Sequence, residues 1–187
     1  SGGTKVAWNS EYGGSGLFNI GDNGADNMIN KGFRVYTVTF ADGVAVDVYV
    51  LHMDAETADS DDDYDSNGKD KNIVAREAQL KQLADHIKNN HNNRPVIILG
   101  DTNCRYTREH LETGFIDYIN ADSRFTIKDA WVEHMWDGVY PIYGSNAMMT
   151  HTYGAQKGEV VDKIFYINTT ESNLVLEANS YLHDTSV

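Results

Sequence analysis

The chain has 187 residues, 41% hydrophobic and 11% aromatic, which suits one domain with a substantial core. Its formal net charge of −13 argues against an electrostatic grip on nucleic-acid phosphates or anionic membranes. No stretch approaches the ~20 apolar residues that span a bilayer. We therefore expect a single domain over residues 1–187, with no strong nucleic-acid patch and no transmembrane segment.

The first third of the chain predicts one short strand and a β-hairpin. Residues 1–31 are rich in Gly, Asn, Ser and Asp and lack periodicity, which indicates a loop with a strand near 5–8. Two β-rich runs, 33–40 and 44–51, flank Asp42-Gly43, a strong hairpin signal. The second strand leads directly into His52.

An acidic segment follows, because residues 54–65 hold seven acidic residues and no basic one. Asp63, Asp65 and Asn67 alternate like the first half of a calcium loop, with Gly68 as the turn residue. The twelfth position, however, is Val74 where a glutamate should sit, so an EF-hand is not expected. The alternatives are a non-EF Ca²⁺ site at Asp63, Asp65 and Asn67, and a plain solvated loop over 55–72.

A helix and a buried strand form the centre of the chain. Apolar residues share one helical face over 73–90, namely Ile73, Leu80, Leu83, Ala84 and Ile87. The apolar run 96–99 then predicts a strand covered on both faces, which Gly100 ends. Strand, loop, helix and strand form the crossover unit of an α/β fold.

Beyond Asn103, we expect helical turns over 107–120 and 129–134, an aromatic loop over 136–158, and strands over 159–168 and 173–182. Asp162 interrupts the first of these strands, and a charge within an apolar strand needs a partner or a function. The only cysteine, Cys104, excludes a disulfide framework and is expected to be a small buried residue.

Four polar residues stand at the ends of these strands or inside them: His52, Asp101, Asn103 and Asp162. Strand ends at one edge of a sheet converge, which is where such folds place their chemistry. Asp101 and Asn103, two residues apart, can share a hard cation such as Mg²⁺, although Asp101 can also be an ordinary turn residue. A histidine can bind a phosphate oxygen or move a proton, and a second aspartate can orient water.

These motifs together carry a resemblance to a known family. Their order is Leu51-His52-Met53-Asp54, Arg76 with Gln79, Gly100-Asp101-Thr102-Asn103, and Val161-Asp162-Lys163-Ile164-Phe165. The series resembles the endonuclease/exonuclease/phosphatase superfamily, which includes DNase I-like nucleases, neutral sphingomyelinases and inositol phosphatases. Thr102 departs from the aromatic or other apolar residue usual there.

The resemblance implies an α/β fold, a four-layer α/β sandwich of the DNase I type. It also implies hydrolysis of a phosphate ester by water with Mg²⁺ or Mn²⁺, either sphingomyelinase-like or nuclease-like. Catalytic roles carry over to His52, Asp101, Asn103 and Asp162, and metal binding to Asp101 and Asn103. His151, in Thr150-His151-Thr152-Tyr153, matches a region that contacts substrate; the alternative is that it packs among the aromatic residues around it.

The resemblance covers only part of the family's domain. The opening strand with its metal-binding glutamate and the closing Ser-Asp-His element have no convincing equivalent, since Glu11 lies in a Gly/Ser loop and His183-Asp184 has the reverse order. We therefore expect a truncated domain that lacks the N-terminal strand and the C-terminal end. The alternative function is a noncatalytic binding module on the same scaffold, with the acidic loop as a Ca²⁺-dependent surface.

Overall fold

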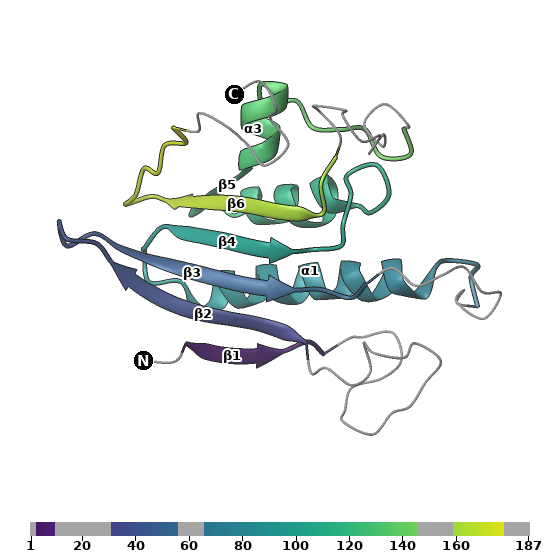
Figure 1. Cartoon of the computed structure of the whole chain (residues 1–187), viewed down its shortest axis with the longest axis horizontal. Helices are drawn as coiled ribbons and strands as arrows, with labels where there is room; N and C mark the ends of the chain where they lie inside the picture. The colour runs from purple at the N-terminus through teal and green to yellow at the C-terminus, as the bar shows by residue number, and fades with distance from the viewer. Residues whose placement is uncertain (1–2, 10–30, 56–65, 146–158, 178–187) are drawn as a thin grey trace.

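The structure, a computed structural model, describes residues 3–9, 31–55, 66–145 and 159–177 (Figure 1). In these residues one six-stranded mixed sheet has the order β1-β2-β3-β4-β6-β5. The strands are β1 (Thr4–Ala7), β2 (Gly32–Thr39), β3 (Ala45–His52), β4 (Val96–Asp101), β5 (Phe125–Asp129) and β6 (Asp162–Thr169). The helices are α1 (Lys71–Asn90), the π-helix η3 (Glu112–Ile116), α2 (Asp117–Asn120) and α3 (Ala130–Trp136).

The predicted hairpin is confirmed as β2 and β3, which pair antiparallel. Its turn uses Gly43 at a φ of +86°, and the Asp42 carboxylate accepts the backbone N–H of Val44 at 3.1 Å. The short strand predicted near residues 5–8 is confirmed as β1, which pairs antiparallel with β2.

Helix α1 begins two residues before its predicted start because Asp70 caps it. The Asp70 carboxylate accepts the backbone N–H groups of Asn72 at 2.7 Å and Ile73 at 3.3 Å. The helix connects β3 to β4, and these two strands pair in parallel, which confirms the crossover unit. No helix in the described ranges is both long and apolar enough to cross a membrane.

One face of the sheet is buried under helices. Figure 1 shows α1 and the η3–α2 segment behind the strands. The side chains buried here include Phe33, Tyr49, Ile98, Phe165 and Ile167 from the strands, and Leu80, Leu83 and Ile87 from α1. Helix α3 packs against β5 and β6.

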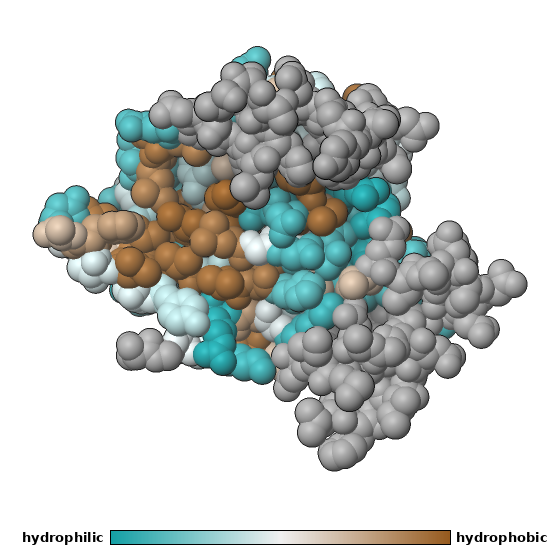
Figure 2. All heavy atoms as spheres, viewed as in Figure 1, coloured by the Kyte–Doolittle hydropathy of each residue, from teal (hydrophilic) through white to brown (hydrophobic). Residues whose placement is uncertain are grey.

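The opposite face carries apolar side chains in two cross-strand rows. Each row crosses β3, β4 and β6, and the rows are Val50, Leu99 and Ile164, then Val48, Ile97 and Tyr166. Val50 is 44% exposed and Ile164 38% exposed. Figure 2 shows hydrophobic residues gathered over the middle of this face, and hydrophilic residues where β3 and β4 end.

The described residues therefore form a mixed α/β layer, and the expected four-layer sandwich is not seen within them. The strand at 96–99 is fully covered on one face only, because Val96 and Ile98 are buried whereas Ile97 and Leu99 remain partly accessible. This corrects the expectation that both of its faces are covered.

The C-terminal region differs from prediction at two places. Strand β5 was not expected, although Phe125 and Ile127 alternate with polar residues and bury their side chains. The strand expected over 173–182 is wrong where the structure describes it, since residues 173–177 form no strand. The Asn168 side chain explains this path, because its amide accepts from the Leu174 N–H and donates to the Leu174 carbonyl.

Gly100 lies where the backbones of β4 and β3 are close together. Its φ is +143°, and a Cβ atom there would lie 2.1 Å from the Leu51 carbonyl oxygen. Only glycine fits both the backbone conformation and the space. Gly100 therefore permits the register that aligns the ends of β3 and β4.

Replacing Gly100 by alanine should destabilise the protein. We expect Gly100→Ala to lower the free energy of unfolding by about 2 kcal/mol or more, because the new methyl group meets backbone and the φ is unfavourable. Urea unfolding followed by circular dichroism measures the change. The matched control is Gly114→Ala in η3, where the nearest atom is 3.8 Å away and a change of about 0.5 kcal/mol or less is expected. Equal stability of the two variants would contradict this account.

Candidate active site

Three of the four predicted catalytic residues share one row of the sheet. In the register, His52 on β3 is opposite Asp101 on β4, and Asp101 is opposite Asp162 on β6. The alternation along each strand places these residues on the same face as the two apolar rows. Three strands from different parts of the chain thus place polar residues side by side at one edge of the sheet.

His52 and Asp101 lie closest together. His52 Nε2 is 3.7 Å from Asp101 Oδ2, and the two side chains are 54% and 34% exposed. The main chain links the same strand ends, because the Met53 N–H donates to the Asp101 carbonyl at 2.9 Å. The Trp8 indole N–H also donates to the His52 carbonyl at 2.8 Å, which ties β1 to this edge.

Asn103 is held beside Asp101 by a tight turn. Its backbone N–H donates to Asp101 Oδ1 at 2.8 Å, and its φ of +49° is one that asparagine tolerates. Its Nδ2 donates to the Met53 carbonyl at 3.3 Å. The turn predicted as an alternative to a site is therefore present, and it also brings Asn103 to the row.

Thr102 points inward between these two residues. It is 1% exposed, and both its N–H and its hydroxyl donate to the Val161 carbonyl, at 3.0 and 2.8 Å. This double contact fixes the residue just before Asp162 against the residue just after Asp101. At Thr102, hydrogen bonds therefore join the end of β4 to the start of β6.

The Arg76 and Gln79 side chains of α1 contact the segment that follows His52. Both are fully buried; Gln79 accepts the Asp54 N–H at 3.0 Å, and Arg76 donates to the Asp54 carbonyl at 3.4 Å. Arg76 also pairs with the buried Glu109 at 2.9 Å. These two residues hold the chain that follows His52 in place.

Glu109 connects this support to the turn at Asn103. Its carboxylate accepts from Arg108 Nε at 2.7 Å and from the Arg105 N–H at 2.7 Å. Arg108 in turn donates to the Asn103 carbonyl at 2.6 Å. Sequence patterns did not predict this role of Glu109, because its partner Arg76 lies on α1, 33 residues earlier in the chain.

A second buried ionic group lies under Asp162. Lys163 is 1% exposed and donates to the Val160 carbonyl at 2.8 Å. Its Nζ lies 3.8 Å from Glu159 and 4.0 Å from Asp129, two buried carboxylates that offset the cost of burying an ammonium group. Glu159 also accepts from the Tyr106 N–H and the Thr107 hydroxyl, so the start of β6 is joined to the segment after Asn103.

Oxygen donors gather in the row at the sheet edge, in Asp101, Asp162 and Asn103. Since Asn103 Nδ2 donates to Met53, its amide oxygen is the atom that can face a cation. Mg²⁺ usually takes one or two protein carboxylates and completes its shell with water and phosphate oxygens, and this donor set fits that habit. Within the described ranges, no group of three or more His, Cys, Asp or Glu side chains could hold a metal ion.

Several predicted residues lie outside the described residues. These are His151, Asp63 and Asp65, together with Glu11 and the His183-Asp184 pair. Asn67 is described and lies in a turn beside Gly68, whose φ is +73°. The substrate contact at His151 and the Ca²⁺ site at Asp63, Asp65 and Asn67 therefore stay predictions.

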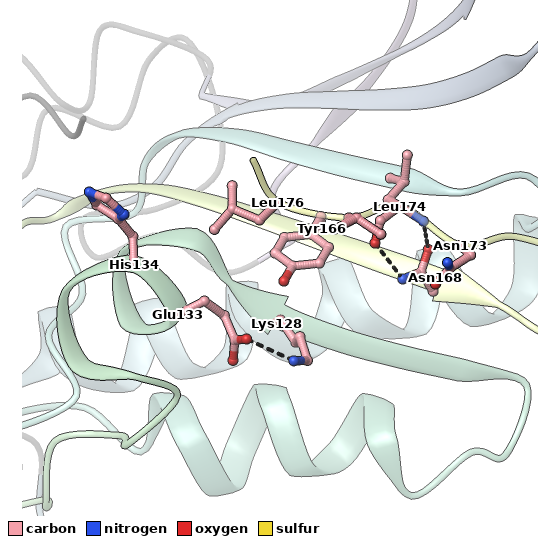
Figure 3. A pocket seen from close by; sticks show the side chains of 9 residues that line it. Lys128, Glu133, His134, Tyr166, Asn168, Asn173, Leu174 and Leu176 are labelled. Carbon is pink, nitrogen blue, oxygen red and sulfur yellow. Dashed lines mark hydrogen bonds and ion pairs between the residues drawn. The ribbon is translucent and has the colours of Figure 1, made fainter. Parts of the chain in front are cut away.

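A separate hollow of about 440 Å³ lies between α3, β6 and residues 173–176 (Figure 3). Its charged residues already pair, with Lys128 Nζ 2.7 Å from Glu133 Oε2. Tyr166, which lines it, is four residues along β6 from Asp162, roughly 13 Å in a strand. This hollow is thus distinct from the row at the sheet edge.

Comparison with known proteins gives distant relatives by sequence. No family model matches the chain. Sphingomyelinases of Mycobacterium bovis and Mycobacterium tuberculosis are each 28% identical to it over 158 residues, which is 84% of this chain. This distant, partial similarity agrees with the resemblance to the endonuclease/exonuclease/phosphatase superfamily that the sequence motifs carry. It spans 27% of the length of these relatives.

Several solved structures are also similar to parts of the chain. The human Nocturnin catalytic domain with bound sulfate is 20% identical, with a TM-score of 0.49, over 74% of this chain and 42% of that one. Sphingomyelinase C from Streptomyces griseocarneus is 16% identical, with a TM-score of 0.46, over 87% and 47%. A beta toxin variant from Staphylococcus aureus, with bound magnesium ions, is 19% identical, with a TM-score of 0.44, over 81% and 47%.

Cys104 lies three residues after Asp101 and is completely buried, as the sequence analysis expected. Burial raises the pKa of its thiol far above the usual range, and the Glu109 carboxylate adds to the increase. A neutral, inaccessible thiol is a poor nucleophile. Cys104 therefore packs beneath the site and does not take part in its chemistry.

A thiol reagent should distinguish the folded from the unfolded protein. We expect Cys104 to react with 5,5′-dithiobis(2-nitrobenzoic acid) at least about 100-fold more slowly in native buffer than in guanidinium chloride, because reaction requires opening of the core. The absorbance of the released thiolate measures both rates, and the single cysteine makes the signal unambiguous. Fast labelling of the native protein would contradict its burial.

Proposed function

We propose that this chain carries the central part of a metal-dependent phosphoric ester hydrolase site, which cleaves a phosphodiester or phosphomonoester by attack of water. The supporting observation is the single row of His52, Asp101 and Asp162 at the ends of three neighbouring strands, with Asn103 beside it. The relation to sphingomyelinases agrees with this chemistry. Because the chain spans 27% of the length of those relatives, the activity of the whole protein belongs to the proposal.

Each residue of the row has a role in this proposal. Asp101 and Asn103 would hold Mg²⁺ or Mn²⁺, a cation that stabilises charge on the phosphoryl group and makes water more acidic. The Asp101 carboxylate, 3.7 Å from His52 Nε2, orients the imidazole, whose N–H can donate to a phosphate oxygen. Asp162, on the same face, orients the attacking water and accepts its proton.

The proposal also assigns the four-layer sandwich to the complete domain. In that arrangement a second sheet covers the apolar face. The observation that supports a second sheet is the pair of apolar rows on this face, where the Val50 side chain is 44% exposed and the Ile164 side chain 38% exposed. Contiguous apolar surface of this kind is normally covered, because burial removes it from water.

Substitutions in the row test the hydrolase assignment. In the whole protein, His52→Ala and Asp101→Asn should each lower kcat/KM for bis(4-nitrophenyl) phosphate by about 100-fold or more, because each removes a group that acts on the phosphate or on water. Glu171→Gln is the matched control, since Glu171 lies beyond the opposite end of β6 and glutamine keeps an acceptor for Asn93 Nδ2. Release of 4-nitrophenolate measures the rate. Wild-type rates in either row variant would refute the assignment.

Metal binding separates the hydrolase from the noncatalytic alternative. Isothermal titration calorimetry should detect Mg²⁺ binding in the wild-type protein and its loss in Asp101→Asn, because that change removes a carboxylate ligand. The expected result for Asp63→Asn with Asp65→Asn is unchanged Mg²⁺ binding. Ca²⁺ binding that depends on Asp63 and Asp65, with no Mg²⁺ binding at Asp101, would instead favour the binding module.

A further inference from the structure

A hollow of about 330 Å³ lies beside His52, between β1, β2 and β3. His52, Val50 and Gly32 line it together with two basic residues, Lys5 and Arg34. Its volume is at the lower end of the range for small-molecule sites. The hollow opens on the same sheet face as the His52, Asp101 and Asp162 row.

The strand register brings the two basic residues close to His52. Lys5 on β1 is directly opposite Arg34 on β2, and Arg34 is opposite Val50 on β3. Since His52 follows Val50 by two residues, Arg34 is its diagonal neighbour, with Cα atoms roughly 7–8 Å apart in such pairs. An extended arginine side chain spans that distance, so a ligand at His52 is within its reach.

The pairing of Lys5 with Arg34 is unfavourable without a further partner. Like charges directly opposite each other destabilise a sheet. In the described part of the chain neither residue contacts a carboxylate, although the net charge is −13. Other cations are paired at 2.5 to 3.0 Å, and these are Lys69, Lys81, Arg94, Arg124 and Lys128.

We propose that Lys5 and Arg34 bind a second anionic group of the substrate, such as a phosphate, next to the ester that is cleaved at His52. The inference rests on the proposed hydrolase function and names its substrate class, a phosphoester that carries a second anion. Binding such a group relieves the repulsion between the two cations and forms charge-assisted hydrogen bonds. A choline phosphodiester such as sphingomyelin carries a quaternary ammonium there instead, which these cations would repel.

A pair of matched substrates tests the selectivity. One is a 4-nitrophenyl phosphodiester whose alcohol carries a phosphate, and the other has a hydroxyl in its place. In the whole protein, Lys5→Gln with Arg34→Gln should lower the ratio of kcat/KM for the phosphorylated over the hydroxyl substrate by about ten-fold or more. Loss of structure would lower both values alike, so the fold of the double variant is first checked by circular dichroism. An unchanged ratio in the folded double variant overturns the proposal.

A control variant separates local binding from total charge. Lys81→Gln with Arg124→Gln removes the same charge from exposed positions on α1 and before β5. We expect this variant to keep the wild-type ratio. An equal fall of the ratio in both double variants overturns the proposal, because the effect would then be one of net charge.

A binding measurement makes the subsite testable without hydrolysis. Calorimetry with inorganic pyrophosphate should show binding to the wild-type protein that weakens about ten-fold or more in Lys5→Gln with Arg34→Gln. If neither diester is cleaved but this difference is found, the hydrolase proposal fails and the anion subsite stands. Absent binding, or equal binding in both proteins, overturns the subsite.

The source of the anion follows from a third measurement. Vesicles of phosphatidylcholine with phosphatidic acid should bind the wild-type protein more than the double variant if the second phosphate belongs to a lipid headgroup. If the double variant loses selectivity for the soluble phosphorylated substrate but binds vesicles like the wild-type protein, the second phosphate belongs to a soluble phosphoester. Either result supports the proposal. If the double variant instead loses cleavage of single-stranded DNA while its ratio of kcat/KM values is unchanged, the proposal is overturned, and the two cations bind a polynucleotide.

Discussion

The alignment of β3, β4 and β6 is the constraint on which the candidate site depends. The parallel pairing of β3 with β4 puts His52 level with Asp101, and the antiparallel pairing of β4 with β6 adds Asp162. A shift of one residue in either pairing would send one of these side chains to the helix-covered face. Gly100 permits the close contact with Leu51 that this register requires. Backbone geometry thus determines which side chains can act together.

Buried charges hold the segments that extend beyond these strand ends. Glu109 joins Arg76 of α1 to Arg108, and Arg108 holds the Asn103 carbonyl. Lys163 joins the start of β6 to two buried carboxylates. Such groups are costly to bury unless each is paired, so they favour one arrangement of the connecting segments over others. The exposed row above them can then keep its polar groups oriented toward solvent and ligand.

The same face of the sheet combines three kinds of surface. The polar row ends the sheet, the apolar rows lie behind it, and Lys5 with Arg34 stands to one side. Similarity to sphingomyelinases agrees with the phosphoester chemistry proposed for the row. The two neighbouring cations, Lys5 and Arg34, favour a substrate with more negative charge. The proposed chemistry and the proposed specificity therefore lie on different strands, as expected when a shared scaffold serves several substrates.

The sequence by itself determined the hairpin, α1, the β3–α1–β4 crossover and the placement of His52, Asp101 and Asp162 at strand ends, because these depend on local patterns such as alternation, helical periodicity and turn residues. It missed β5, and it predicted a strand over residues 173–177 where the Asn168 side chain holds the chain in another path. Only the tertiary structure revealed Glu109 and the Lys5–Arg34 hollow. Glu109 is 33 residues from its partner Arg76, and Lys5 and Arg34 lie on different strands, so helix packing and strand register alone bring each pair together.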